Sequence, residues 1–110
     1  MWQRPLTSSV SLHLSVSLPP DIEHILRPLL TALDDIGYAP SYFLLSQSFG
    51  NFQITFTCAA HSFSVVRDRG QFMLSGAPQQ ELEAFDLFRV FSTPGQMVPS
   101  VISWLSAIAG

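Results

Sequence analysis

The sequence predicts an α+β fold, a two-layer sandwich in which an antiparallel sheet of about five strands carries its helices on one face. Residues 49–76 alternate apolar and polar side chains in short runs between turn signals, which predicts consecutive antiparallel strands. Residues 22–36 and 82–108 instead space their apolar side chains at helical intervals, which indicates helices buried along one side. A length of 110 residues suits a single domain, 1–110, with one core. The expected order is strand, helix, four strands, helix, helix.

The first expected strand covers residues 10–18 and has the most regular alternation in the chain. Its apolar positions are Val10, Leu12, Leu14, Val16 and Leu18, and the alternate positions hold serines and His13. Pro19 and Pro20 end the strand because neither residue can donate a ladder hydrogen bond. We expect this strand beside the other four or at their edge, with its serine-rich face toward solvent or a partner.

The first helix is expected between Asp21, as its N-cap, and Gly37, as its terminator. Its apolar stripe consists of Ile22, Ile25, Leu26, Leu29, Leu30, Leu33 and Ile36. Pro28 conflicts with one continuous helix, because an interior proline removes a hydrogen bond and clashes with the preceding turn. Either the helix kinks at Pro28, or the first turn is separate and Pro28 opens the main helix.

Four strands follow as a meander, the first of them over residues 42–48. Gly50-Asn51 predicts the turn into the next strand, which carries Phe52, Ile54, Phe56 and Cys58 on one face. Residues 59–62 connect this strand to a run containing Phe63 and Val65. Asp68-Arg69-Gly70 predicts a hairpin turn before Phe72 and Leu74, and Gly76-Ala77-Pro78 closes the sheet. We expect the sheet face under the helices to consist of Phe52, Ile54, Phe56, Phe63, Val65, Phe72 and Leu74.

Two helical segments finish the chain. Leu82, Phe85, Phe88 and Phe91 mark the first, with Leu87 and Val90 widening its apolar side. The second begins near Thr93-Pro94-Gly95-Gln96, a sequence that resembles a capping box, and Pro99 delays its regular part. Trp104 lies among apolar residues of this helix, so we expect it in the core.

Composition and charge narrow the class of protein. Hydrophobic residues make up 47% of the chain and charged residues 12%, against about 25% charged in typical domains. A chain with so few charged residues leaves apolar surface exposed when it folds, and exposed apolar patches are typical of binding sites for a partner. The net charge of −3 argues against a nucleic-acid partner, which needs a clustered basic surface, and permits a basic protein partner. No apolar stretch has the length of a membrane helix, and no signal-peptide pattern is present, so we expect no membrane association and a cytoplasmic location.

The sequence predicts no catalytic centre, metal site or cofactor, and hence no enzyme. His13, His24 and His61 share no ligand spacing, so surface histidines are favoured over a metal site. Cys58 is the single cysteine and stands in register with Phe56, which predicts a buried, inert thiol. No nucleophile elbow, phosphate loop or dinucleotide fingerprint occurs.

The candidate partner-binding residues are charged and lie at the ends of elements: Asp34, Asp35, Arg67, Asp68, Arg69, Glu81 and Glu83. Asp34 and Asp35 end the first helix, where they form either a solvated helix end or an acidic patch for a basic partner. The hairpin cluster is either a polar tip with a local ion pair or a recognition tip that presents two guanidinium forks.

Two motifs carry a family resemblance over residues 22–92: Phe49-Gly50-Asn51, and Val66 to Gln71 with the letters VRDRGQ. At these motifs the chain resembles small bacterial immunity-type proteins, encoded near polymorphic or contact-dependent toxins. Such proteins often carry a Trp-Tyr-Asp-like element after the last strand, where this chain has Phe85-Asp86-Leu87. In that family the motif stabilises the hairpin, while variable surfaces hold the toxin.

The resemblance implies a cytoplasmic immunity protein, monomeric or homodimeric, that occludes the active site of a toxin by stoichiometric binding. The alternative is a secretion chaperone or adaptor that holds an effector segment. A third possibility, an enzyme with a small pocket between sheet and helices, requires convergent polar groups that the sequence does not identify.

Overall fold

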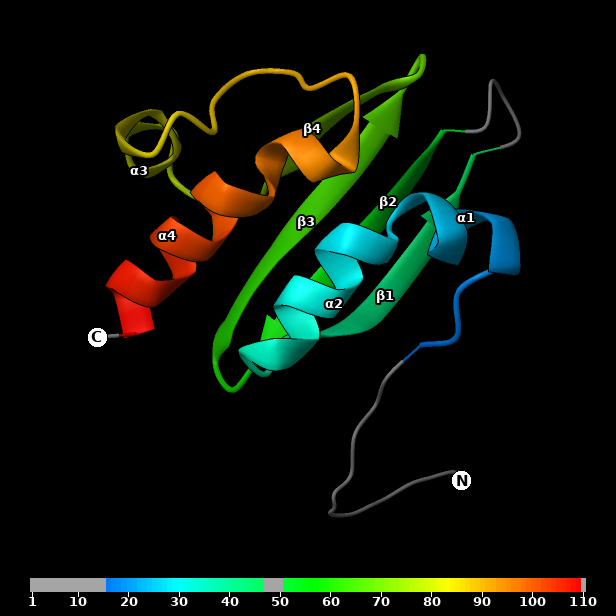
Figure 1. Ribbon diagram of the computed structural model, residues 1–110, viewed down its shortest axis with the longest axis horizontal. Helices are drawn as coiled ribbons and strands as arrows, with labels where there is room; N and C mark the ends of the chain where they lie inside the picture. The colour runs from blue at the N-terminus through cyan, green and yellow to red at the C-terminus, as the bar shows by residue number, and fades with distance from the viewer. Residues whose placement is uncertain (1–15, 47–50, 110) are drawn as a thin grey trace.

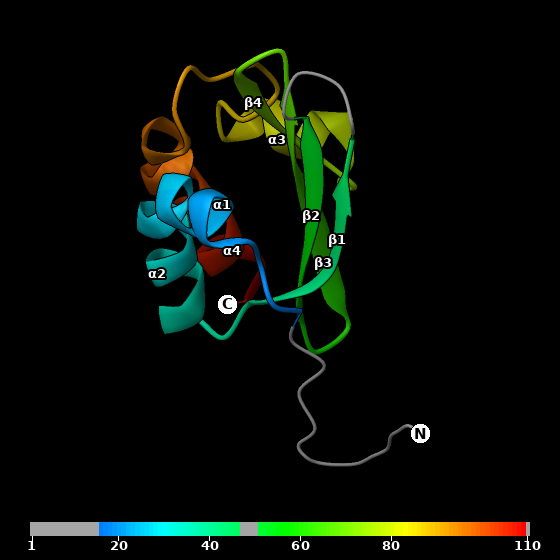
Figure 2. The same ribbon diagram turned by 90° about the vertical axis from the view of Figure 1, so that its right-hand side faces the viewer.

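The computed structural model describes residues 16–46 and 51–109, which form one antiparallel sheet with helices against one of its faces (Figures 1 and 2). The predicted α+β class and the two-layer arrangement are therefore confirmed. The sheet of the described residues has four strands in the order β1-β2-β3-β4, each paired antiparallel with the next. These strands are β1 (Ala39–Leu45), β2 (Phe52–Cys58), β3 (His61–Asp68) and β4 (Gln71–Ser75).

The predicted fifth strand, residues 10–18, falls largely outside the described residues. Its last three members, residues 16–18, are described and have no regular secondary structure. The amide of Val16 nevertheless donates a 2.9 Å hydrogen bond to the carbonyl of Pro40, at the start of β1. The chain therefore enters the described domain at the outer edge of β1.

The first helical segment is divided into α1 (Pro20–Ile25) and α2 (Arg27–Asp35). Pro28 lies in the first turn of α2, so of the two alternatives the separate first turn is confirmed. The predicted Asp21 cap is wrong, because Pro19 is the N-cap and Pro20 opens the helix. A proline at the first helical position has its φ already set, which starts the helix one residue before Asp21. Gly37 follows α2 with a φ of +91°, as expected of a terminator.

The strand boundaries differ slightly from those predicted. β1 begins at Ala39 rather than residue 42, and it accommodates Pro40 through a register shift between Pro40 and Tyr42. Gly50 of the predicted turn is one of residues 47–50, which lie outside the described residues. The predicted hairpin turn between β3 and β4 is confirmed, and both Arg69 and Gly70 have a positive φ, 55° and 79°.

The helix predicted through Phe91 is shorter than expected. α3 (Gln79–Ala84) is only six residues long, and Asp86 takes a φ of 58°. Phe91 pairs instead with the outer edge of β4, where its backbone exchanges hydrogen bonds of 2.8 and 2.7 Å with Phe72. This pairing satisfies backbone groups of β4 that a helix at Phe91 would leave unpaired.

The predicted capping box at Thr93 and Gln96 is confirmed, with the Gln96 side chain accepting from the amides of Ser92 and Thr93 at 2.9 and 3.3 Å. It opens a 3-10 turn, η1 (Pro94–Met97), that leads directly into α4 (Val98–Ala109). Pro99 lies in the first turn of α4, where its missing amide hydrogen costs little.

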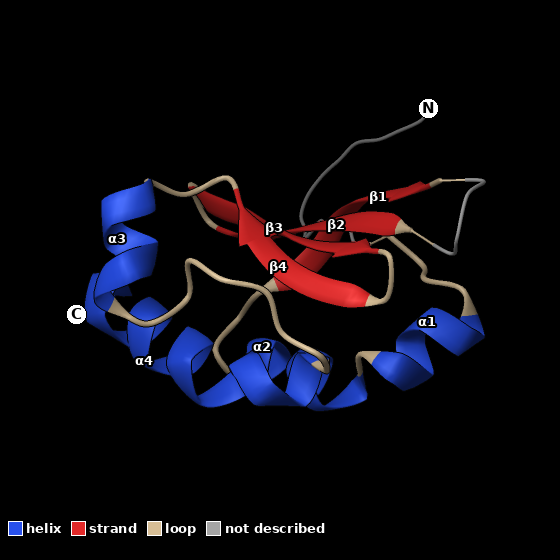
Figure 3. Ribbon diagram, turned by 90° about the horizontal axis from the view of Figure 1, so that it is seen from above, coloured by secondary structure: helices blue, strands red, loops and turns tan. Residues whose placement is uncertain are grey.

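The core lies between the sheet and the layer formed by α1, α2 and α4 (Figure 3). All seven predicted sheet residues are buried there: Phe52, Ile54, Phe56, Phe63, Val65, Phe72 and Leu74. Leu29 and Leu33 from α2 and Trp104 from α4 are fully buried opposite them. The face assignment made from the alternation is therefore confirmed, and so is the core position of Trp104.

Candidate functional site

The face of the sheet that points away from the helices carries no described helix (Figure 3). The strand register aligns its side chains in rows across all four strands: Leu44, Gln53, Val66 and Met73 in one row, and Tyr42, Thr55, Ser64 and Ser75 in the next. Thr57 and Ser62 continue the surface on β2 and β3. We call these ten residues the open face. All ten are uncharged.

The open face combines exposed apolar side chains with hydroxyls that bond to one another. Tyr42 and Leu44 are 52% and 53% exposed. The Thr55 and Ser64 hydroxyls lie 2.9 Å apart, and the amide of Gln53 donates to Ser64 at 3.4 Å. Because these polar groups already have partners, covering them costs less than burying unpaired hydroxyls. Excluding water from this surface on binding therefore costs little free energy.

The charged hairpin between β3 and β4 adjoins one end of the open face. A shallow hollow of about 400 Å³ at this end is lined by Leu44, Val66 and Met73 together with Arg67 and Asp68. The structure thus brings apolar side chains of the sheet next to charges of the hairpin.

The two arginines of the hairpin differ in their surroundings. Arg67 pairs across the sheet with Phe52 and Phe72, and its guanidinium carbon lies 5.8 Å from the centre of the Phe72 ring. Arg69 is exposed at the tip. Alternation along β3 places Arg67 on the side of the buried phenylalanines, so of the two guanidinium groups only that of Arg69 stands at the exposed tip. Asp68 and Arg69 remain as the exposed charges of the tip.

Asn51 contacts the turn of this hairpin. The side-chain oxygen of Asn51, before β2, accepts a 2.8 Å hydrogen bond from the backbone amide of Arg69. The bond fixes the turn at the residue whose φ of 55° is unfavourable for a side-chain-bearing residue. Asn51 and Arg69 are 18 residues apart, so only the folded meander shows that the two residues are in contact.

The predicted acidic residues do not gather into one patch. Asp34 and Asp35 are exposed at the end of α2, whereas Glu81 and Glu83 lie on α3, which Figure 1 shows at another corner of the molecule. Glu81 is half-buried and accepts a 2.6 Å hydrogen bond from the indole nitrogen of Trp104. It therefore anchors α3 to α4, a role that the sequence did not reveal. Glu83 is exposed and accepts from Gln79 at 3.2 Å.

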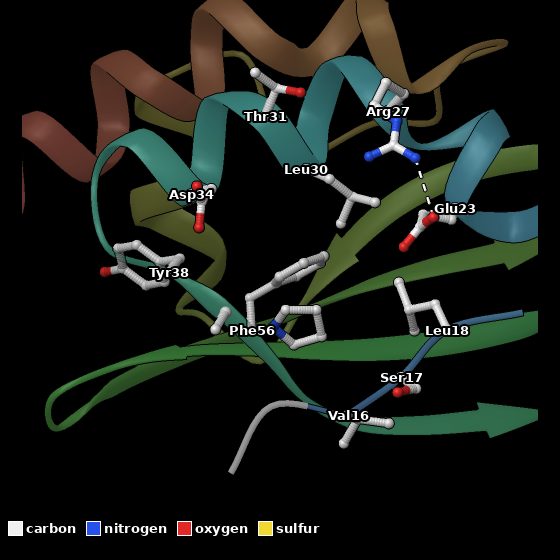
Figure 4. A pocket seen from close by; sticks show the side chains of 12 residues that line it. Val16, Ser17, Leu18, Glu23, Arg27, Leu30, Thr31, Asp34, Tyr38 and Phe56 are labelled. Atoms are coloured by element: carbon white, nitrogen blue, oxygen red, sulfur yellow. Dashed lines mark hydrogen bonds and ion pairs between the residues drawn. The ribbon is translucent and has the colours of Figure 1, made fainter. Parts of the chain in front are cut away.

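A cleft of about 520 Å³ separates α2 from the start of β1, and residues 16–18 border it (Figure 4). Leu30 and Phe56 face each other across it, and Asp34 lies at one end. The charged groups at its other end are engaged with each other, since Arg27 and Glu23 form a 3.0 Å ion pair. The lining of the cleft is thus mixed, with Leu30 and Phe56 on its walls and charged side chains at its ends.

A third hollow, of about 360 Å³, lies where the β2–β3 hairpin meets α4, and it is lined by Ile36, Tyr38, Cys58, His61, Leu105 and Ile108 among others. The Tyr38 hydroxyl and His61 Nδ1 are 2.7 Å apart. Burial raises the pKa of Tyr38, and the neighbouring Cys58 raises it further. Tyr38 and His61 are 23 residues apart, so sequence spacing could not indicate this contact.

The prediction of a buried Cys58 is wrong, because its side chain is only partly buried. Cys58 pairs with His61 at the end of the sheet, where the helices cover the sheet only partly. We expect Cys58 to react with a small thiol reagent in the folded protein, since its side chain lines an open hollow. Timed labelling followed by mass measurement tests this. Cys58→Ser should abolish the label, and Ile108→Trp should slow the labelling by narrowing the hollow. Labelling that occurs only in denaturant would contradict the expectation.

Within residues 16–46 and 51–109, no group of three or more His, Cys, Asp or Glu side chains is placed to hold a metal ion. Of the three histidines, His24 and His61 lie on separate elements and His13 lies outside the described residues. In the part of the chain that the structure describes, no helix is long and apolar enough to cross a membrane. Comparison of the chain with protein-family models, curated proteins and solved structures finds no match.

Proposed function

We propose that this protein is a cytoplasmic immunity protein that binds a bacterial toxin domain and occludes its active site. The observation that carries the proposal is the open face, with its two half-exposed apolar side chains, Tyr42 and Leu44, and its self-bonded hydroxyls. Interfaces are depleted of charge at their centre and polar at their rim. The open face supplies such a centre, and Asp68 and Arg69 supply part of such a rim.

The hairpin supports the same proposal. The Asn51–Arg69 hydrogen bond gives the shared motifs a structural task, which is the role that the resemblance implies for them. The side chains of Asp68 and Arg69 then point from a fixed turn, so less conformational entropy is lost when a partner orders them.

The net charge of −3 favours a basic toxin, because complementary charge accelerates association. A tagged copy expressed in the native host should therefore capture one stoichiometric partner, identified by mass spectrometry. That partner should be toxic when expressed alone and harmless when expressed with this protein. Capture of a secreted effector whose activity is unchanged by binding would favour the secretion chaperone instead.

We expect Asp34→Lys with Asp35→Lys to slow association about tenfold at low ionic strength and to weaken its salt dependence. The dissociation rate should change little, because both residues lie in the helix layer rather than on the open face. Association and dissociation rates measured across salt concentrations test this split. Asp21→Lys with Asp86→Lys changes the net charge equally and serves as the control. If the two pairs slow association equally, the net charge of the protein, rather than the position of Asp34 and Asp35, accelerates association. If neither pair changes the association rate, Asp34 and Asp35 are only a solvated helix end.

A further inference from the structure

The hollow at the β2–β3 hairpin lies on the helix side of the sheet, apart from the open face. Cys58 and His61 line it and pair with each other. Alternation along the two strands turns their side chains away from the side that Thr57 and Ser62 occupy in the open face. Figures 1 and 2 show this hairpin at the same end of the molecule as the last turns of α2 and α4. The proposed contact with a toxin therefore makes no use of the hollow.

The size and the walls of the hollow suit a small molecule. Its volume of about 360 Å³ falls within the range of about 300–1,000 Å³ that is usual for small-molecule sites. Ile36, Leu105 and Ile108 give it apolar walls. Ile36 and Ile108 are 36% and 41% exposed, so a ligand that covers them removes apolar surface from water.

One polar pair is held in place in the lining. The Tyr38 hydroxyl and His61 Nδ1 lie 2.7 Å apart, and the His61 ring meets the Trp104 ring edge-on at 5.7 Å between centres. Because burial raises the pKa of Tyr38, the phenol stays protonated near neutral pH. A protonated hydroxyl can donate to His61 and still accept a hydrogen bond. The Tyr38 oxygen is thus a fixed acceptor beside apolar walls.

The electrostatic surroundings of the hollow favour a positive charge. Ile36 directly follows α2 and Ile108 lies in the last turn of α4, so both helices direct the negative end of their dipole toward the hollow. Asp35, next to Ile36, adds a carboxylate at this end. No arginine is found among the described residues that line the hollow, and the chain has no lysine. Arg27 opens α2 and so lies at the opposite end of that helix.

We propose that this hollow binds a small organic cation, an ammonium group carried on an aromatic body. The aromatic body packs against the isoleucines and Leu105, while the ammonium group donates to the Tyr38 oxygen near the two helix ends. A neutral ligand of the same shape gains the apolar contacts alone, and an anion is repelled by the helix ends. The site goes beyond the proposed function and does not depend on it.

Three probes with one indole ring test the class of ligand: tryptamine, which is a cation at neutral pH, tryptophol, which is neutral, and indole-3-acetate, which is an anion. Each is titrated into the full chain while backbone amide shifts are followed by NMR. Tryptamine should bind with a dissociation constant of about 1 mM or tighter. Tryptophol should bind about tenfold more weakly and indole-3-acetate more weakly still. The shifted amides should cluster at residues 36–38, 58–61 and 105–108.

A substitution that fills the hollow tests the location. Ile108→Trp should weaken tryptamine about tenfold, because the larger side chain occupies the volume that the indole needs. Ile25→Trp is the matched control, since Ile25 is 38% exposed on α1 and does not line the hollow. The control also keeps the net charge, so it separates binding in the hollow from diffuse attraction of a cation to an acidic protein.

Four results would overturn the proposal: no saturable binding of tryptamine, binding of tryptophol or indole-3-acetate as tight as that of tryptamine, shifts that cluster elsewhere, or equal effects of Ile108→Trp and Ile25→Trp. Amide shifts of the two variants without ligand show whether each keeps the fold. If Ile108→Trp were to disturb it, the shift map of the unmodified chain would decide the location by itself. A failure to find a toxin would leave each of these results unaffected.

Discussion

Replacing Phe56 by alanine is expected to lower the free energy of unfolding by about 3–5 kcal/mol. Phe56 is fully buried at the centre of β2, and its ring stacks on Phe63 with 5.7 Å between the ring centres. Its removal takes apolar surface out of the core and leaves a cavity that the rigid sheet fills only in part. Since small domains are stable by about 5–15 kcal/mol, the loss is a large share of the total.

Urea denaturation followed by tryptophan fluorescence measures this loss, because Trp104 is fully buried in the same core. Phe88→Ala is the matched control, since Phe88 is 53% exposed and the same atoms are removed. The control should change stability by about 0.5 kcal/mol or less. Similar losses for the two variants would contradict the packing described for the sheet.

The sequence predicted the fold correctly where the local alternation of apolar and polar side chains matches the alternation of buried and exposed side chains in the structure. From Phe52 to Leu74 each strand has one buried face and short turns, so the alternation of side chains reports directly on the core. The segment after Ala84 could not be predicted in this way. Leu87 and Phe91 are buried, as a helical stripe would be, yet a long-range pairing with Phe72 determines the backbone.

The same difference between local features and long-range contacts applies to the candidate site. The sequence indicated the charged hairpin and the polar side of the strands, because both are local features. It could not indicate that Glu81 binds the indole of Trp104, because this contact joins residues that are 23 apart in the sequence. The open face became recognisable as one surface only when the register aligned residues from four strands.

Introducing charge at the two ends of one row of the open face is expected to abolish most of the binding to the proposed toxin partner. Leu44 and Met73 end the same row across the sheet, on β1 and β4. Leu44→Arg with Met73→Arg would place two guanidinium groups where a partner has to remove water, without an acceptor to receive them. The dissociation constant should rise about 100-fold, which corresponds to about 2.7 kcal/mol.

The same double variant should remain folded, because arginine on the outward side of a strand keeps its charge in water in the unbound protein. A control pair, Phe88→Arg with Val90→Arg, adds the same charge at side chains that are 53% and 45% exposed outside the sheet. Affinity for the captured partner and unfolding midpoints would be measured for both pairs. If the control pair weakens binding as much as the open-face pair, the toxin binds elsewhere. If only the open-face pair does so while its unfolding midpoint stays unchanged, the row from Leu44 to Met73 belongs to the interface.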